Sequence, residues 1–340
     1  MHFHSFLRVP TAMAAASFVL LAATVAHAGT PGFIQSVYRD WMAPNAADFA
    51  RDSARLAPAL QALCDAPADK ADASLQPARQ QWLTTLSNWE RLSAVAIGPL
   101  IERRSQRQID FTPTRPRLIE KAVKSAPTSP ADMELIGTPA KGLPALEWLL
   151  WVQPVQPASP ECRYAVQVAA EIEREAVALD EAYKQAAQRT PDSAAATAAL
   201  SELVNQWVGG LERLRWANME MPVRVAMTSK RDISPDFPRR GSGASADSWA
   251  AQWTALRALA AGSGPMSVET ALRERGQAKV ADALVRAIRQ ADARMQGLTI
   301  GDKAKILAAA KELAALKRLA EEQVAPALGV SIGFSDADGD

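Results

Sequence analysis

A single glutamate stands inside the most apolar stretch of the chain after its N-terminal segment. Glu147 lies in a run from Lys141 to Trp151 that reads KGLPALEWLLW. Because apolar residues flank it on every side of a helix, we predict that Glu147 is buried. A buried carboxylate needs a cation, hydrogen-bond donors or a proton. Glu147 is therefore either a structural residue, ion-paired or reaching the surface, or part of a functional site, and both interpretations stay open.

Histidine, the usual proton carrier and zinc ligand, occurs only in the first 28 residues, as His2, His4 and His27. That segment has the pattern of a signal peptide: one basic residue, an apolar or small stretch over residues 11–25, and Ala-His-Ala before position 29. The stretch is shorter than the roughly 20 residues that span a bilayer, so cleavage is favoured over a membrane anchor. The mature chain, expected in the periplasm, then has no histidine, which excludes Ser-His-Asp and Cys-His catalysis.

The chain has two cysteines, Cys64 and Cys162. In an exported protein a lone pair is most simply one disulfide, and two separate buried thiols are the alternative. Cleavage removes one basic residue, so the 38 basic residues fall to the number of acidic ones, 37. A net charge of zero argues against nucleic acid as a partner. The chain after residue 28 has no apolar run comparable to the one in the predicted signal peptide.

Two further segments carry clustered charge. Residues 227–247 form a long predicted loop in which four basic residues precede Gly-Ser-Gly and a helix start. Such a loop either binds an anion or is a solvated connection. The acidic residues at the C-terminal end alternate, but the glycine among them is misplaced for a calcium loop, so a solvated tail is favoured. These residues are Lys230, Arg231, Arg239, Arg240, Asp336, Asp338 and Asp340.

The elements that must position these residues are helices. Ala and Leu dominate, and the alternation typical of strands is absent. Two successive sets of about four helices predict an all-α fold of two antiparallel four-helix-type bundles packed together, over residues 29–190 and 191–340. The expected helices cover residues 49–64, 74–97 with Ser74 as N-cap, 117–124, 130–136, 143–152, 161–188 after Ser159-Pro160, 194–221 with Gly209-Gly210 inside, 248–261, 268–295 and 302–328. The helical spacing of most tryptophans indicates a core role.

The segment from Gly142 to Glu147 resembles the Gly-x-His-x-x-Glu motif of the imelysin-like proteins, once classed as M75 peptidases. The Trp-rich run over residues 78–91 and the C-terminal run over residues 328–340 resemble the same family, so the likeness covers nearly the whole mature chain. The resemblance implies a periplasmic or surface protein of two helical bundles, commonly associated with iron uptake.

One departure from the motif matters. Pro144 stands where the family has histidine, so Glu147 is the only member of that His–Glu pair that carries over. The usual zinc ligands are thereby reduced to carboxylates, and an ordinary metalloprotease is disfavoured. The identity of any cofactor stays open, and iron or another hard cation held by carboxylates is the chemistry that remains. We expect weaker transition-metal binding than in relatives that keep both residues.

The sequence thus predicts a non-peptidase, imelysin-like binding or accessory protein in metal acquisition, with iron-transport components of the cell envelope as partners. The site is expected where the two bundles meet, near Glu147, Trp89, Arg91 and Arg240, with Arg91 as the ion-pair partner of Glu147. The alternatives are a structural or interaction protein with a vestigial site and a carboxylate-based metallohydrolase. The sequence does not identify the ligand or the oligomeric state.

We predict that the mature protein begins at Gly29, because the small-x-small pattern ends at Ala28. N-terminal sequencing and intact mass of protein from a periplasmic fraction measure this. A full-length chain of 340 residues recovered from the membrane fraction would refute cleavage.

Overall fold

The computed structural model describes residues 29–231, 233–262 and 264–333, and it contains only helices, turns and loops there. The all-α class is therefore confirmed for the described chain. The predicted signal peptide and the acidic residues 336, 338 and 340 lie outside the described residues. None of the described helices is long and apolar enough to cross a membrane.

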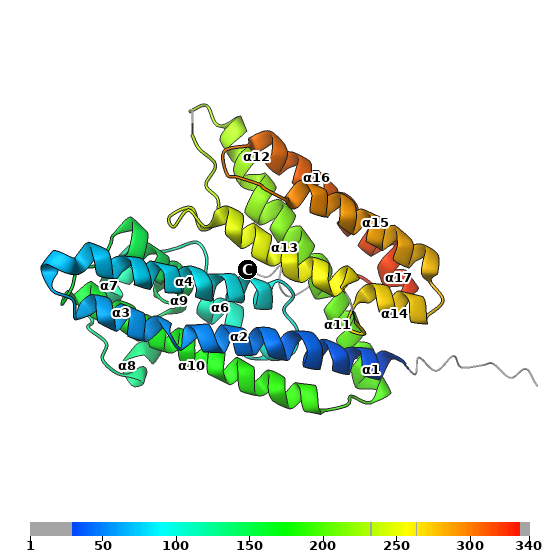
Figure 1. Ribbon diagram of the computed structural model, residues 1–340, viewed down its shortest axis with the longest axis horizontal. Helices are drawn as coiled ribbons and strands as arrows, with labels where there is room; N and C mark the ends of the chain where they lie inside the picture. Colours follow the sequence, from blue (N-terminus) through cyan, green and yellow to red (C-terminus); the bar gives the residue numbers. More distant parts are fainter. Residues whose placement is uncertain (1–28, 232, 263, 334–340) are drawn as a thin grey trace, which may run out of the picture.

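The first half of the chain packs around the longest helix, α10. This helix lies against α2 and α3, and both of these contact α4 (Figure 1). The elements of this half are α1 (Gly29–Ser36), η1 (Val37–Met42), α2 (Ala43–Ser53), α3 (Leu56–Cys64), η2 (Ala68–Lys70), α4 (Ala71–Ser93), α5 (Pro99–Glu102), α6 (Ser105–Ile109), α7 (Pro116–Lys124), α8 (Pro130–Glu134), η3 (Thr138–Ala140), α9 (Gly142–Glu147), η4 (Trp148–Val152) and α10 (Pro160–Gln188).

The second half places α15 against α16, and α16 against the π-helical segment η5. Its elements are α11 (Ser193–Glu212), η5 (Arg213–Glu220), α12 (Met221–Thr228), α13 (Ser245–Ala261), α14 (Val268–Glu274), α15 (Ala278–Met295), α16 (Lys303–Leu319), η6 (Ala320–Val324) and α17 (Ala325–Ala327). Helix α13 also lies along α4, and α1 contacts α11, so the two halves share an interface (Figure 1). The predicted grouping into two four-helix bundles and the boundary at residue 190 remain predictions.

Local sequence signals explain some of the helix boundaries. Helix α10 begins at Pro160, and the Ser159 hydroxyl accepts a hydrogen bond from the Cys162 N–H, as the N-cap prediction required. The predicted Ser74 N-cap is wrong, because α4 begins at Ala71 and no side chain caps it. The same helix ends at Ser93 rather than at the predicted Ile97. Helix α11 passes directly against the residue that follows: a Cβ at Gly210 would lie 2.2 Å from the Ala94 carbonyl oxygen. Close approach therefore accounts for the glycine inside α11.

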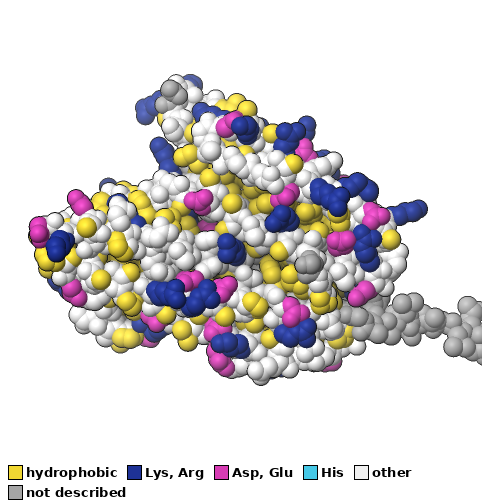
Figure 2. Space-filling view, viewed as in Figure 1, with side chains coloured by type: hydrophobic (Ala, Val, Ile, Leu, Met, Phe, Trp, Pro, Cys, Tyr) yellow, Lys and Arg dark blue, Asp and Glu magenta, His cyan; other side chains and the backbone are white. Residues whose placement is uncertain are grey.

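Tryptophans fill the core, as their helical spacing predicted. The side chains of Trp82, Trp89, Trp207 and Trp249 are almost fully buried, whereas Trp216 is 41% exposed. The visible surface carries interspersed acidic and basic side chains without a broad area of one sign (Figure 2). This distribution agrees with the nearly balanced formal charge of the chain, which has 38 basic and 37 acidic residues.

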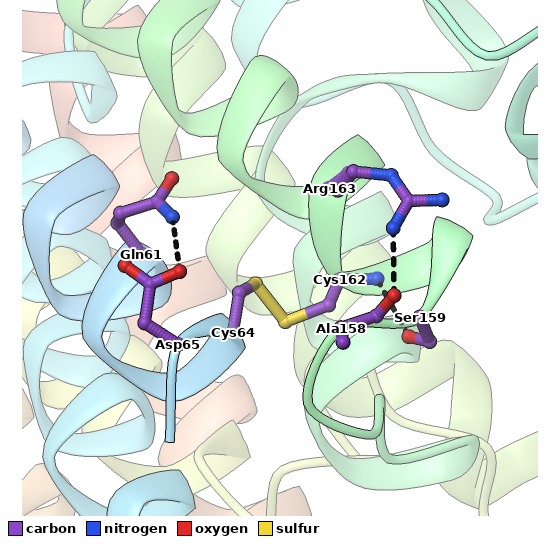
Figure 3. The surroundings of a disulfide bond; sticks show 7 residues. All are labelled: Gln61, Cys64, Asp65, Ala158, Ser159, Cys162 and Arg163. Atoms are coloured by element: carbon purple, nitrogen blue, oxygen red, sulfur yellow. Dashed lines mark hydrogen bonds between the residues drawn. A yellow bond between two sulfur atoms is a disulfide. The ribbon is translucent and has the colours of Figure 1, made fainter. Parts of the chain in front are cut away.

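A disulfide joins the end of α3 to the start of α10, which confirms the predicted pairing. Cys64 and Cys162 have Cα atoms 5.6 Å apart and are separated by 98 positions in the sequence. Beside the bond, the Ala158 N–H donates to the Cys64 carbonyl, and the Arg163 guanidinium donates to the Ala158 carbonyl (Figure 3). The covalent link therefore fixes the turn that precedes α10 against α3.

We predict that a Cys64→Ser/Cys162→Ser variant loses about 4–5 kcal/mol of unfolding free energy, because a long loop is no longer closed in the unfolded chain. Urea unfolding of the variant and of the oxidised and reduced wild type measures the loss. The reduced wild type is the matched control and should unfold with the variant. Free thiols on both cysteines of the native protein would contradict the bond.

Candidate functional site

The loop over residues 233–244 inserts one arginine into the protein interior. The side chain of Arg239 is only 4% exposed. Its Nη2 lies 2.5 Å from both carboxylate oxygens of Asp110, and its Nε lies 3.4 Å from Glu90 Oε1. Burial lowers the pKa of Arg239, but the charges of the surrounding carboxylates outweigh burial and raise it. The guanidinium is therefore a permanent cation in this cluster.

Glu90, on α4, is the most thoroughly bonded member of the cluster. Its Oε1 accepts a hydrogen bond from the Ser248 hydroxyl at 2.7 Å, and its Oε2 accepts one from Gln252 Nε2 at 2.8 Å. Asn218 Nδ2 donates to Gln252 Oε1 and so fixes the orientation of the Gln252 side-chain amide. Burial raises the pKa of Glu90, and Arg239 opposes that rise only in part. The carboxylate is held entirely by donors from α13 and from the loop.

Asp110 follows α6 and closes the other side of the cluster. Besides its contact with Arg239, its Oδ2 accepts a hydrogen bond from Trp89 Nε1 at 3.0 Å. Two consecutive residues of α4 are thus connected to the Arg239 guanidinium. Glu90 contacts it directly, and Trp89 is linked to it through Asp110. Three separate segments of the chain are joined at this point.

Glu147 is buried, as its apolar surroundings predicted, and is 7% exposed. Its Oε1 accepts hydrogen bonds from the backbone N–H of Ser242 at 2.9 Å and from the Ser242 hydroxyl at 2.8 Å. The predicted ion pair with Arg91 is wrong, because Arg91 is exposed on α4. Two donors from the loop satisfy the carboxylate instead, while the charge of Arg239 acts on it from nearby.

Two glycines make this arrangement possible. Gly142 has φ +76°, and a Cβ there would lie 2.3 Å from the carbonyl oxygen of Ile109. Helix α9, which carries Glu147, can therefore lie directly against the residue that precedes Asp110. Gly241 lies next to Glu147: its Cβ would be 3.3 Å from Glu147 Oε1 and 3.1 Å from Val152 Cγ2. Close packing and a positive φ thus require the glycine of the motif, whereas a Cβ at Gly241 would fit only if the neighbouring side chains moved by a few tenths of an ångström.

The cluster forms one wall of a cleft of about 1230 Å³. Trp89, Glu90, Asp110 and Arg239 line it, together with residues of α5, α6, α11, η5 and α13. Residues from both halves of the chain line this cleft. Of the residues predicted from the sequence, Trp89 lines the cleft, Glu147 lies behind the loop, and Arg91 and Arg240 are exposed and do not line it.

Part of the cleft wall consists of polar groups without partners. Gln206 of α11 is 6% exposed, and its carboxamide oxygen has no hydrogen-bond partner within the described chain. Buried amides are nearly always hydrogen-bonded, so this one is suited to a donor supplied by a ligand or by water. Arg104 and Arg107 also line the cleft; both residues are exposed, and neither side chain forms an ion pair with any residue that the structure describes.

The donor set does not fit a metal ion. In the described ranges, no group of three or more His, Cys, Asp or Glu side chains is arranged to hold one. Glu90 and Asp110 already contact a guanidinium, Glu147 accepts from Ser242, and Pro144 has no atom that can coordinate. The carboxylates that the sequence offered as ligands for a hard cation are therefore engaged with protein donors.

The sequence analysis missed Glu90, Asp110 and Gln206, and it named Arg239 only as one of the four basic residues of the loop. A signal existed for Glu90, since it lies four residues after Leu86 and three before Ser93, on the same face of α4 as the predicted core positions. Arg239 and Asp110 lie in irregular segments, where no periodicity separates a buried side chain from an exposed one. Arg239 also adopts φ +64°, a strained conformation for a residue with a side chain.

We predict that Arg239→Met destabilises the protein by about 3–5 kcal/mol, because it leaves Glu90 and Asp110 buried without their cation. Arg240→Met is the matched control: its side chain is 51% exposed and lies 3.8 Å from an almost fully exposed Asp236. The control should unfold at the same urea concentration as the wild type. Equal losses in the two variants would contradict the role assigned to Arg239.

Comparison with known proteins places this fold. The crystal structure of an imelysin-like protein from Psychrobacter arcticum 273-4 superposes with a TM-score of 0.74 at 20% identity, covering 91% of this chain and 98% of that one. The crystal structure of a protein described as an iron-regulated protein A precursor, from Parabacteroides distasonis ATCC 8503, superposes with a TM-score of 0.72 at 14% identity, covering 88% and 95%. At these identities the two structures show the shared fold alone.

Sequence comparison gives the family. No curated protein matches the chain. The imelysin family model, which carries the name peptidase M75, matches residues 42–325, which is most of the chain. The chain therefore belongs to the imelysin family.

Proposed function

We propose that this protein is a periplasmic binding or accessory protein in iron acquisition and that it is not a peptidase. The family supports an imelysin-like role, and the structurally similar protein from Parabacteroides distasonis is described as iron-regulated. The cleft between the two halves would be the binding site. Its partners would be iron-transport components of the cell envelope.

The observation that carries this proposal is the unpartnered polar wall of the cleft. The Gln206 carboxamide is buried at the cleft without a hydrogen bond to its oxygen. A polar ligand that donates to this oxygen would remove the cost of leaving it unpaired. The guanidinium groups of Arg104 and Arg107, which line the same cleft, suit an acidic group on such a ligand. A polar small molecule fits this wall better than a bare metal ion does.

The groups that zinc-dependent, histidine-dependent and thiol peptidases need are not assembled among the described residues. A catalytic zinc needs about three protein ligands and an open position, and the described residues bring no such set together. The cysteines are joined in a disulfide, and all the histidines precede Gly29. The carboxylate-based metallohydrolase therefore ranks below a binding role.

A second candidate is an interaction protein whose ancestral site no longer binds a ligand. Exposed apolar side chains on the consecutive segments η5 and α12 favour this role, since an exposed apolar patch marks a contact surface. Trp216 is 41% exposed, Val225 53% and Met227 62%. This surface is separate from the cleft lining, so variants of the cleft distinguish the two candidates.

We predict that deleting the gene in its native host reduces uptake of radioactive iron under iron limitation and that the wild-type gene restores it. Arg104→Ala/Arg107→Ala should restore it poorly, because the cleft loses both guanidinium groups that have no ion-pair partner in the described chain. Arg286→Ala/Arg289→Ala is the matched control, with two exposed arginines at the same spacing on α15. It should restore uptake fully.

Each other outcome counts against part of the proposal. Unchanged iron uptake in the deletion strain would refute the role in iron acquisition. Equal, full restoration by both double variants would move the function away from the cleft and favour the interaction protein.

A further inference from the structure

Arg239 lies where the acidic side chains of this site converge. Glu90 comes from α4, Asp110 from the segment after α6, and Glu147 from α9. Arg239 contacts the first two directly, and the third is bonded to Ser242, three residues further along the same loop. Glu90 and Asp110 thus bring carboxylate oxygens from two separate elements to one cation, and such oxygens are the ligands that a hard metal ion prefers.

The guanidinium of Arg239 neutralises Glu90 and Asp110 and leaves no place for a metal ion between them. Its charge is permanent, it is buried, and it is tethered to the chain, so it cannot be exchanged with solvent. Both oxygens of Asp110 face Nη2, and Glu90 Oε1 faces Nε. An approaching metal ion would meet a positive charge inside its own coordination shell.

We propose that Arg239 is a built-in cation that takes the place of a metal ion between Glu90 and Asp110, so that removing the guanidinium converts this cluster into a metal site. The inference does not depend on the proposed function, because it concerns which cation the cluster accepts and not what the cleft binds.

Terbium(III) is a suitable probe, since it prefers oxygen ligands and its emission is sensitised by a nearby indole. Trp89 Nε1 donates to Asp110 Oδ2 at 3.0 Å, so a terbium ion bound by Asp110 would lie close to that ring. Titration with Tb³⁺ under tryptophan excitation should give sensitised emission in Arg239→Met, with affinity at least about tenfold higher than in the wild type. Arg240→Met, the exposed neighbour, should behave as the wild type and defines the background from surface carboxylates.

Further variants assign the ion to this site. Adding Glu90→Gln to Arg239→Met should abolish the gain in affinity, because one ligand is lost with little change in shape. Adding Trp89→Phe should remove the sensitised emission while calorimetry still detects binding.

Loss of stability does not prevent a decision. Arg239→Gln, which removes the charge but keeps an amide donor for Asp110, is measured in parallel. Because an ion that binds only the folded state stabilises it, Tb³⁺ should raise the melting temperature of both Arg239 variants and leave that of the wild type unchanged. If neither variant gains affinity or melting temperature with Tb³⁺, whether folded or unfolded without it, the proposal is overturned. Wild-type binding as tight as that of Arg239→Met, with emission that depends on Trp89, would also overturn it.

Discussion

The buried contact of Arg239 with Glu90 and Asp110 is the interaction on which the arrangement of the site depends. Burying a guanidinium costs several kcal/mol unless ion pairs and hydrogen bonds compensate for its lost hydration. Here the compensation comes from α4 and from the segment after α6, whereas the arginine belongs to the loop before α13. Next to it, Phe237 packs edge-on against Trp249 with ring centroids 5.0 Å apart. One polar and one apolar contact therefore fix residues 237–239 of the connection before α13 and join the two halves of the chain.

The same cluster explains how far the sequence could be read at the site. The prediction chose Arg91 and Arg240, and the structure uses their neighbours, Glu90 and Arg239. On a helix this error could have been avoided, because consecutive residues point about 100° apart and Glu90 shares the face of Leu86. In the loop it could not, because the buried position follows from a left-handed backbone at Arg239 and from the partners it meets. Long-range ion pairs of this kind leave no local pattern.

The fold was more predictable than the site, and its errors have tertiary causes. Helix composition, the Ser159 cap and the cysteine pair led to the all-α class, the start of α10 and the disulfide. The extension of α4 through Ile97 failed although Ala94 and Ala96 favour helix, because Gly210 packs against the Ala94 carbonyl and Arg213 donates to it. The glycine pair in α11 signalled a close approach, but only the structure identifies the segment that approaches. The π-helical segments η4 and η5, one beginning directly after Glu147, had no sequence signal that we recognised.

Charge balance connects the changed motif to the chemistry of the site. Pro144 lies at the third position of α9, within the first turn, where backbone N–H groups have no partner in the helix, so proline costs no hydrogen bond there. It does remove the only place in the motif where a neutral imidazole could bind a metal ion. The buried carboxylates still require positive charge or donors, and Arg239, Ser242, Ser248 and Gln252 supply both. The acidic cluster is thus satisfied by the protein itself. Among the described residues of the cleft, the groups without a protein partner are the Gln206 carboxamide oxygen and the two exposed arginines, Arg104 and Arg107. The proposed binding of a ligand therefore rests on these groups of the cleft wall rather than on the motif.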